Sequence, residues 1–147
     1  MSVLSVEDRL ELQDLSTRFA LAVDHHDYEA LRAVFVPEAH YVSTNGTDIH
    51  GLDELIAWFQ SRVTPGVRRV TRHGLSGLLL TGVDHSSATG LSTWHTFASN
   101  EAGPASVPLF QVADFADRYV RRGDRWWILE RITTPVFRDE SLAPGAR

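Results

Sequence analysis

Four ionisable residues in a row, Asp24-His25-His26-Asp27, form a compact group of chemically capable side chains near the start of the sequence. Carboxylates and imidazoles bind metals, and they are also common general acids and bases. A third interpretation is structural, because such residues are typical of the polar junction between two helices. The rest of the sequence must decide among these three interpretations.

A metal site is not expected in this cluster, because adjacent histidines point in different directions. Metal-binding pairs prefer the i, i+4 spacing on a helix and the i, i+2 spacing on a strand. The other histidines that could assist are scattered over turns and strand ends: His40, His50 and His85. We therefore predict no bound metal. We place His25, His26 and Asp27 at a solvated helix junction, with Asp27 as the N-cap of the second helix.

The composition narrows the classes of function. The chain has 147 residues, no cysteine and a formal charge of −5, which fits one domain without thiol chemistry. Basic residues form no coherent face, so nucleic-acid binding is not expected. No apolar stretch approaches the length that spans a membrane, and the first residues do not resemble a signal peptide. We expect a cytoplasmic protein whose partner is a small molecule or another copy of the chain.

Helical patterns fill the first part of the sequence. Ser5 is a candidate N-cap, with an acidic residue three positions later as in a capping box. Apolar residues then recur at helical spacing: Leu12, Leu15, Phe19, Ala22 and Val23. A second short helix is predicted from Asp27 and ends at Pro37. A strand over residues 39–44 and a helix over 53–62 follow.

The second half of the sequence changes to the alternation of β-strands. Strands are predicted over residues 67–81, 88–98, 107–120 and 126–133, with a loop around Gly103-Pro104 and a turn at Arg122-Gly123-Asp124. Helices followed by hairpin-connected strands indicate an α+β fold, here a curved antiparallel sheet wrapped around three N-terminal helices in a cone. The open mouth of such a cone is a common place for a ligand pocket. The domain is predicted to span residues 1–138, with a flexible tail over 139–147.

Several segments in this order resemble one known family. They are "FALAVDHHDYEALRAVF", "PEAHY", "GLDEL", "TRHGLSG" and "FADRYVRRGDRWWILER". Over residues 5–138 the chain is similar to the SnoaL-like branch of the nuclear transport factor two-like superfamily. That branch includes polyketide cyclases, scytalone-dehydratase-like enzymes and bile-acid dehydratases. The resemblance implies a cone-shaped α+β barrel, a homodimer and chemistry without a cofactor.

The resemblance also implies catalytic positions. Dehydratase-type members use an aspartate after the first helix, a tyrosine on the first strand and a histidine opening the next long strand. The matching residues are Asp24, Tyr41 and His73. Many such members also carry a tyrosine where this sequence has Val23, so that donor is missing. Some use a second histidine on the following strand, and His95 is the nearest candidate.

These residue types suit proton transfer at carbon. An imidazole at His73 can remove a proton next to a carbonyl group, while Asp24 fixes its tautomer and stabilises the imidazolium. A hydroxyl at Tyr41 can hydrogen-bond the carbonyl and stabilise an enolate. The alternatives are structural: Asp24 caps a helix or binds loop amides, His73 is a core or rim histidine, and Tyr41 is a packed aromatic.

A pocket for a hydrophobic substrate also needs an apolar lining. Apolar candidates are Trp58, Phe97, Leu109 and Phe110, with His95 as a polar member. Arg131 and Arg138 lie on or after the last strand, where they either reach an acidic substrate group or make surface pairs. Trp126 and Trp127 are expected on opposite faces of their strand.

Two functions remain open at this point. The first is a cofactor-independent lyase, isomerase or cyclase acting on a hydrophobic oxygenated molecule such as a polyketide or a steroid-like ring system. The second is a non-catalytic ligand-binding or dimerisation module of the same fold. A deep pocket with Asp24 hydrogen-bonded to His73 supports the first, whereas a cone filled by its own side chains supports the second. In a homodimer, the interface is expected on the exposed sheet face, at Val112, Trp94 or one of the paired tryptophans.

Overall fold

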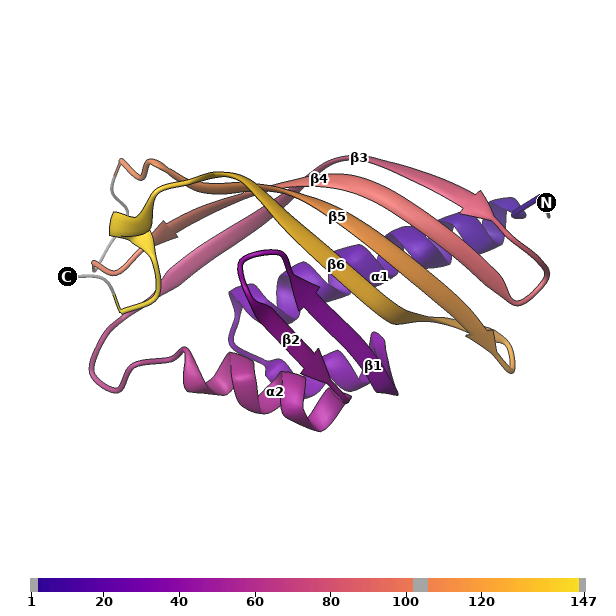
Figure 1. Cartoon of the computed structure of the whole chain (residues 1–147), viewed down its shortest axis with the longest axis horizontal. Coiled ribbons are helices and arrows are strands. Elements are labelled where there is room, and N and C mark those ends of the chain that lie inside the picture. Colours follow the sequence, from indigo (N-terminus) through magenta and orange to yellow (C-terminus); the bar gives the residue numbers. More distant parts are fainter. Residues whose placement is uncertain (1–2, 102–105, 146–147) are drawn as a thin grey trace.

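The chain folds as an α+β cone, in which helices lie inside a strongly curved sheet (Figure 1). The structure is a computed structural model that describes residues 3–101 and 106–145. Its elements in chain order are α1 (Val6–Asp24), the 3-10 helix η1 (Tyr28–Ala33), β1 (Phe35–Ser43), β2 (Thr47–His50), α2 (Leu52–Ser61), β3 (Val70–Gly82), β4 (Ser87–Ser99), β5 (Leu109–Arg122), β6 (Arg125–Arg138) and the 3-10 helix η2 (Glu140–Leu142). The predicted fold class is confirmed.

The six strands form one sheet in the order β2-β1-β6-β5-β4-β3. Strands β3 to β6 are joined in antiparallel hairpin order, as predicted. Strand β1 pairs with β6 in parallel, so the sheet is mixed rather than antiparallel throughout. The long strands arch over α1, and α2 lies beside the short β1–β2 hairpin (Figure 1). This arrangement leaves the inner face of β3 to β6 pointing toward α1.

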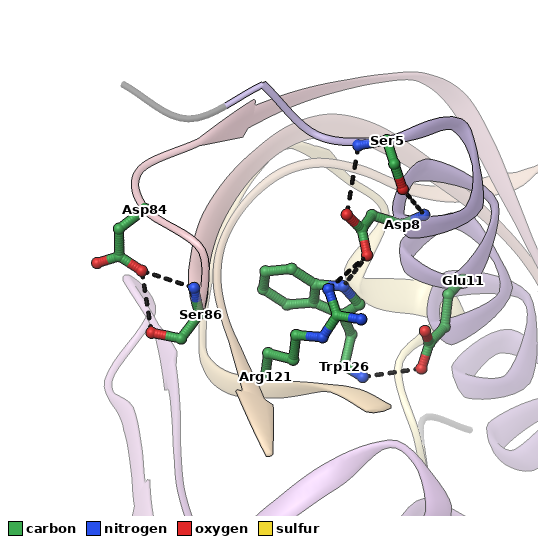
Figure 2. Close-up of polar contacts among 7 residues, drawn as sticks. All are labelled: Ser5, Asp8, Glu11, Asp84, Ser86, Arg121 and Trp126. Carbon is green, nitrogen blue, oxygen red and sulfur yellow. Dashed lines mark hydrogen bonds and ion pairs between the residues drawn. The ribbon is translucent and has the colours of Figure 1, made fainter. Parts of the chain in front are cut away.

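Helix α1 begins as the sequence predicts, and its first turns are hydrogen-bonded to strands β5 and β6. Ser5 and Asp8 form a complete capping box. The carboxylate of Asp8 also accepts hydrogen bonds from Trp126 Nε1 (2.9 Å) and Arg121 Nη1 (3.0 Å), while Glu11 accepts from the Trp126 backbone N–H (2.8 Å). Figure 2 shows these contacts between the first turns of α1 and strands β5 and β6. The hydrogen bond from Trp126 is the main reason that the pKa of Asp8 lies below its ordinary value.

The segment after α1 differs from the prediction. The expected second helix is a single 3-10 stretch, η1, and Asp27 at its N-cap position makes no side-chain cap hydrogen bond. Strand β1 starts at Phe35 and runs through Pro37, which was expected to end the second helix, so the strand begins before the predicted residues 39–44. The pairing of β1 with β6 is irregular between Phe35 and His40, so no ladder hydrogen bond is required from the proline nitrogen.

The two adjacent tryptophans lie on opposite faces of β6, as the alternation predicts. Trp126 is 1% exposed inside the cone, whereas Trp127 is half-buried outside it. Trp94 is buried as well, so neither Trp94 nor Trp126 is available for the subunit contact that the sequence suggested.

The described part of the C-terminal segment packs against the cavity inside the cone, which Ala143 and Pro144 help to line. The segment contains η2, and the backbone N–H of Asp139 donates to the carbonyl of Phe110 (2.8 Å). Its flexibility and the domain boundary at residue 138 stay predictions. The expected loop around Gly103-Pro104 lies outside the described residues. Within the described ranges, no helix is long and apolar enough to cross a membrane.

Candidate active site

Asp24 and His73 are hydrogen-bonded to each other across the cone. His73 Nδ1 lies 2.6 Å from Asp24 Oδ1, and the backbone N–H of His73 donates to Asp24 Oδ2 at 2.9 Å. The hydroxyl of Thr71 donates to Asp24 Oδ1 at 2.8 Å. The carboxylate therefore receives three hydrogen bonds from two residues of one strand, which fixes its orientation.

Local structure explains why these side chains meet. Asp24 is the last residue of α1, and the helix ends in a Schellman motif in which Asp27 N donates to Ala22 O and His26 N donates to Val23 O. His26 takes the left-handed conformation there, with φ of 57°. On β3, alternation places Thr71 and His73 on the same inner face. The end of α1 and the start of β3 thus bring together residues that are distant in the sequence.

The charge on Asp24 sets the tautomer of its partner. Burial acts to raise the pKa of Asp24, but the hydrogen bonds from the side chain and backbone of His73, followed by that from Thr71, outweigh it and hold this pKa below its ordinary value. An ionised carboxylate only accepts hydrogen bonds, so Nδ1 of His73 carries a proton in this pair. In the neutral imidazole, Nε2 is then unprotonated. Nε2 has no hydrogen-bond partner among the described residues, which leaves its lone pair available.

His73 lines a cavity of about 360 Å³ inside the cone. That size falls within the range of small-molecule sites. Five of the candidate catalytic and substrate-binding residues line it: Tyr41, Trp58, His73, Phe110 and Arg138. Asp24 lies behind His73, with a side chain that is 6% exposed, and contacts the imidazole rather than lining the space.

Tyr41 reaches the cavity from β1. Its residue is 7% exposed, and its ring lies 5.7 Å from that of Trp58. Burial raises the pKa of the Tyr41 phenol, partly offset by the charges of Arg131 and Arg62. A phenol with a raised pKa keeps its proton, so the hydroxyl can donate a hydrogen bond to an oxygen in the cavity.

Three residues expected to line the pocket point away from it. His95, Phe97 and Leu109 lie on the outer face of the sheet, opposite the buried Trp94. The ring of His95 packs over Gly74, where a Cβ would come within 2.2 Å of Nε2. The register of β4 determines this outcome, since one residue of shift would have turned His95 inward. Phe97 and Leu109 are 43% and 40% exposed.

The structure also adds residues that the sequence analysis did not assign to the site. Thr71, Arg62 and Arg69 were not singled out, and His26 was assigned only to a solvated junction, where it is exposed; all four line the cavity. Only Thr71 had a readable signal, because it stands two residues before His73 on the same strand face. The arginines enter from loops whose course the sequence does not specify.

Arg131 has neither of the roles considered for it. It is fully buried and makes a bidentate pair with Asp117, with both N–O distances at 2.8 Å. The hydroxyl of Tyr119 completes the group by donating to Asp117 (3.0 Å). Arg131 also lies over the ring of Phe19, at 4.4 Å from its centroid. This ion pair is therefore part of the core beside the cavity.

One group among the described residues has the composition of a metal site: His40, Asp48 and His50 on the β1–β2 hairpin. His40 Nε2 lies 2.7 Å from Asp48, and its Nδ1 lies 3.0 Å from Glu130. The hydrogen bond with Asp48, followed by that with Glu130, raises the pKa of His40. The rings of His40 and His50 stack with planes only 11° apart, and the Nε2 atoms of both lie near the same oxygen, Asp48 Oδ1, at 2.7 Å and 3.1 Å. The geometry fits a protonated His40 held between two carboxylates.

Comparison with known proteins agrees with the fold and defines the family. An uncharacterised Mycobacterium tuberculosis protein, Rv2910c, is 28% identical over 139 residues, which cover 93% of this chain and 91% of that protein. A protein of unknown function with a cystatin-like fold from Nostoc punctiforme superposes with a TM-score of 0.78 at 23% identity, covering 96% of this chain and 98% of that one. A hexachlorocyclohexane dehydrochlorinase gives a TM-score of 0.75 at 16% identity, covering 90% and 87%.

The decisive match is to a family model. Residues 4–132, which include the end of α1, both strands of the hairpin and most of the long strands, match the model of the SnoaL-like domain. The chain is therefore a member of the SnoaL-like domain family.

Proposed function

We propose that the protein is a cofactor-independent lyase, isomerase or cyclase that moves a proton on a hydrophobic, oxygenated small molecule. The observation that carries the proposal is the Asp24–His73 pair, whose imidazole lines a cavity of about 360 Å³. Solved structures with this fold include the hexachlorocyclohexane dehydrochlorinase, an enzyme with elimination chemistry in its name. Family membership supports small-molecule chemistry of this kind, and the geometry supports the choice of residues.

In the proposed reaction, Nε2 of His73 removes a proton from the carbon next to a substrate carbonyl. The electron pair of the broken C–H bond forms an enolate, and the proton stays on Nε2. Asp24 stabilises the resulting imidazolium through Nδ1, at the 2.6 Å contact. In a dehydration, the enolate expels the β-hydroxyl group, which takes the proton from Nε2 and leaves as water. In an isomerisation, the same proton returns to a different carbon.

Tyr41 is the proposed donor to the substrate oxygen. Its buried phenol keeps its proton, and it lines the same cavity as His73. A donor fixed in a water-poor site stabilises the charge that develops on an enolate oxygen. Trp58 and Phe110 supply apolar walls for a ring system.

The test is turnover by purified variants on a panel of hydroxylated polycyclic and polyketide-like ketones. The proposal predicts that His73→Ala loses turnover and that Asp24→Asn retains only a small fraction. His95→Ala is the matched control, because it removes a strand histidine from the outer face. If His73→Ala and Asp24→Asn remain folded and turn over such substrates at the wild-type rate, the assignment is wrong.

The non-catalytic module is the second candidate function. A module that only dimerises has no need of a cavity of this size or of a histidine bonded to a buried carboxylate. The cone is not filled by its own side chains, and its cavity contains the available Nε2 of His73. Ligand binding without turnover by the wild type would favour this candidate.

We also propose a homodimer formed through the outer face of the sheet. That face exposes large apolar side chains: Leu79, Leu91, Phe97, Leu109 and Phe137. Two pairs among them are direct cross-strand neighbours, Leu79 with Leu91 and Phe97 with Leu109, and exposed apolar clusters often mark protein–protein contacts. Sedimentation showing a species of twice 16.4 kDa would support the dimer, and a purely monomeric species would remove it.

A further inference from the structure

In the described part of the chain, the permanently charged side chains that line the cavity are all positive. Three arginines line it, namely Arg62 after α2, Arg69 before β3 and Arg138 at the end of β6. Among the described residues that line it, there is no aspartate or glutamate. A pocket that serves only neutral rings has no use for three guanidinium groups, because each one loses hydration there.

The three arginines differ in how many hydrogen bonds and ion pairs their guanidinium groups make with the protein. Arg69 donates to the Asn100 side chain (2.9 Å) and to the carbonyl of Leu142 (3.0 Å). Arg138 donates to Gln111 (2.8 Å) and pairs with Glu140.

The side chain of Arg62 has no hydrogen bond or ion pair to any described residue, and its guanidinium lies 4.5 Å from the centroid of the Trp58 ring. At least one cation of the group therefore has its donors free.

The charges also repel one another. The pKa of Arg69 is lowered to about 10, first by burial and then by the positive charges of Arg62 and Arg138. Burial followed by Arg138 likewise lowers the pKa of Arg62. Both groups remain protonated near neutral pH. The carboxylate paired with the cluster, Glu140, is 76% exposed, so it offsets little of this charge.

We propose that Arg62, Arg69 and Arg138 bind an anionic substituent of the substrate, a carboxylate or a phosphoryl ester, while the ring system extends toward His73. Guanidinium groups bind both anions through paired N–H donors, and an anion relieves the mutual repulsion of the cluster. Arg69 stands four residues before His73, so the chain separates their Cα atoms by at most about 14 Å. Both side chains line the same cavity, so one small molecule can contact both.

This inference rests on the proposed function only in placing the reacting molecule in the same cavity, and it is tested by binding alone. The probes are 2-naphthoate, 2-naphthyl phosphate and the neutral methyl 2-naphthoate, titrated calorimetrically at low ionic strength. At least one anion is expected to bind about tenfold or more tightly than the ester, as charge-assisted hydrogen bonds imply. Which anion is preferred distinguishes a carboxylate substrate from a phosphoryl one.

Arg62→Gln is the cleanest variant, because the Arg62 side chain makes no hydrogen bond or ion pair with the described residues. This variant is expected to bind the preferred anion about tenfold more weakly than the wild type does, while its affinity for the ester changes by less than about twofold. Arg62→Lys, which keeps the charge, should retain part of the preference. Arg68→Gln is the matched control, since Arg68 is exposed and does not line the cavity.

Equal binding of anions and ester, no binding of either anion, or full retention of the preference in Arg62→Gln would each overturn the proposal. His73→Ala separates it from the catalytic assignment, because this variant should keep the anion preference. If the preference persists while His73→Ala also keeps full turnover, the arginine site stands and the proposed function fails.

Discussion

Replacing Asp24 by asparagine changes one oxygen into an amide nitrogen, and the surrounding donors determine the consequences. Two of the donors to Asp24, the Thr71 hydroxyl and His73 Nδ1, contact Oδ1, and the third, the His73 backbone N–H, contacts Oδ2. If the asparagine oxygen replaces Oδ1, its NH₂ group faces the backbone N–H. That buried donor then lacks a partner, at a cost of about 1–3 kcal/mol.

The other orientation avoids this cost by changing the imidazole. With the oxygen in place of Oδ2, the NH₂ group donates to Nδ1, and the hydroxyl of Thr71 rotates to accept. His73 then carries its proton on Nε2, where it cannot act as a base. Loss of the correct tautomer in an aspartate–histidine pair costs about 10⁴-fold in rate, or about 5.4 kcal/mol in the activation free energy.

Two measurements check this prediction for Asp24→Asn. Nitrogen-15 NMR should show the Nδ1–H tautomer of His73 in the wild type and the Nε2–H tautomer in the variant. Turnover should fall by about 10³–10⁴-fold while the fold is retained. A folded variant that shows the Nε2–H tautomer and still turns over at the wild-type rate would refute the reasoning.

Asp24→Asn should also change how the unfolding free energy depends on pH in the acidic range. The pKa of Asp24 is lower in the folded state than in the unfolded state, so its stabilising contribution is complete above about pH 4 and is lost as pH falls through the folded-state pKa. The difference in unfolding free energy between the wild type and Asp24→Asn should therefore shrink below about pH 4. A difference that is constant between pH 7 and pH 3 would contradict the ionised carboxylate.

Three further predictions concern Thr71 beside Asp24 and two polar clusters elsewhere in the fold. Thr71→Val removes one of three donors to the carboxylate, so turnover should fall by about tenfold or less. His40 has a raised pKa in the folded state, so its contribution to the stability of the fold is complete below about pH 6.5. That contribution is lost as the pH rises through the folded-state pKa of His40. The stability advantage of the wild type over His40→Gln, measured by urea unfolding, should accordingly be smaller at pH 8.5 than at pH 5.5, and an increase would count against it. Asp8→Ala removes the hydrogen bond that the Ser5 backbone N–H donates to the Asp8 carboxylate in the capping box, together with two contacts with the sheet (Figure 2), and should lower the unfolding free energy by about 1–3 kcal/mol. The exposed Asp14→Ala serves as control and should change it by less than about 0.5 kcal/mol.

Much of the fold could be predicted from local patterns. The capping box at Ser5, the apolar stripe of α1 and the alternation of β4 to β6 are properties of short segments, and each appears where it was expected. The errors arise where tertiary context decides. Pro37 is compatible with a strand only because β1 pairs irregularly there, and the parallel contact of β1 with β6 joins distant parts of the chain.

The same distinction separates the site residues that could be predicted from those that could not. Asp24 and His73 were named together through family resemblance, and the structure places them in contact. His95, by contrast, could not be oriented from the sequence, because its direction depends on strand register. Arg62 and Arg69 carry no local signal of a site, since they reach the cavity from the ends of loops. Long-range packing, rather than residue type, decides such positions.

Proton exchange at carbon tests the central claim most directly, because it requires no knowledge of the native substrate. A cyclic ketone such as 2-tetralone, dissolved in D₂O with the protein, exchanges its α-protons when a base forms the enolate, and proton NMR follows the loss of signal. The wild type is predicted to accelerate this exchange, His73→Ala to abolish the acceleration and His95→Ala to leave it unchanged. Acceleration that persists in a folded His73→Ala variant would contradict the assignment of His73 as the base.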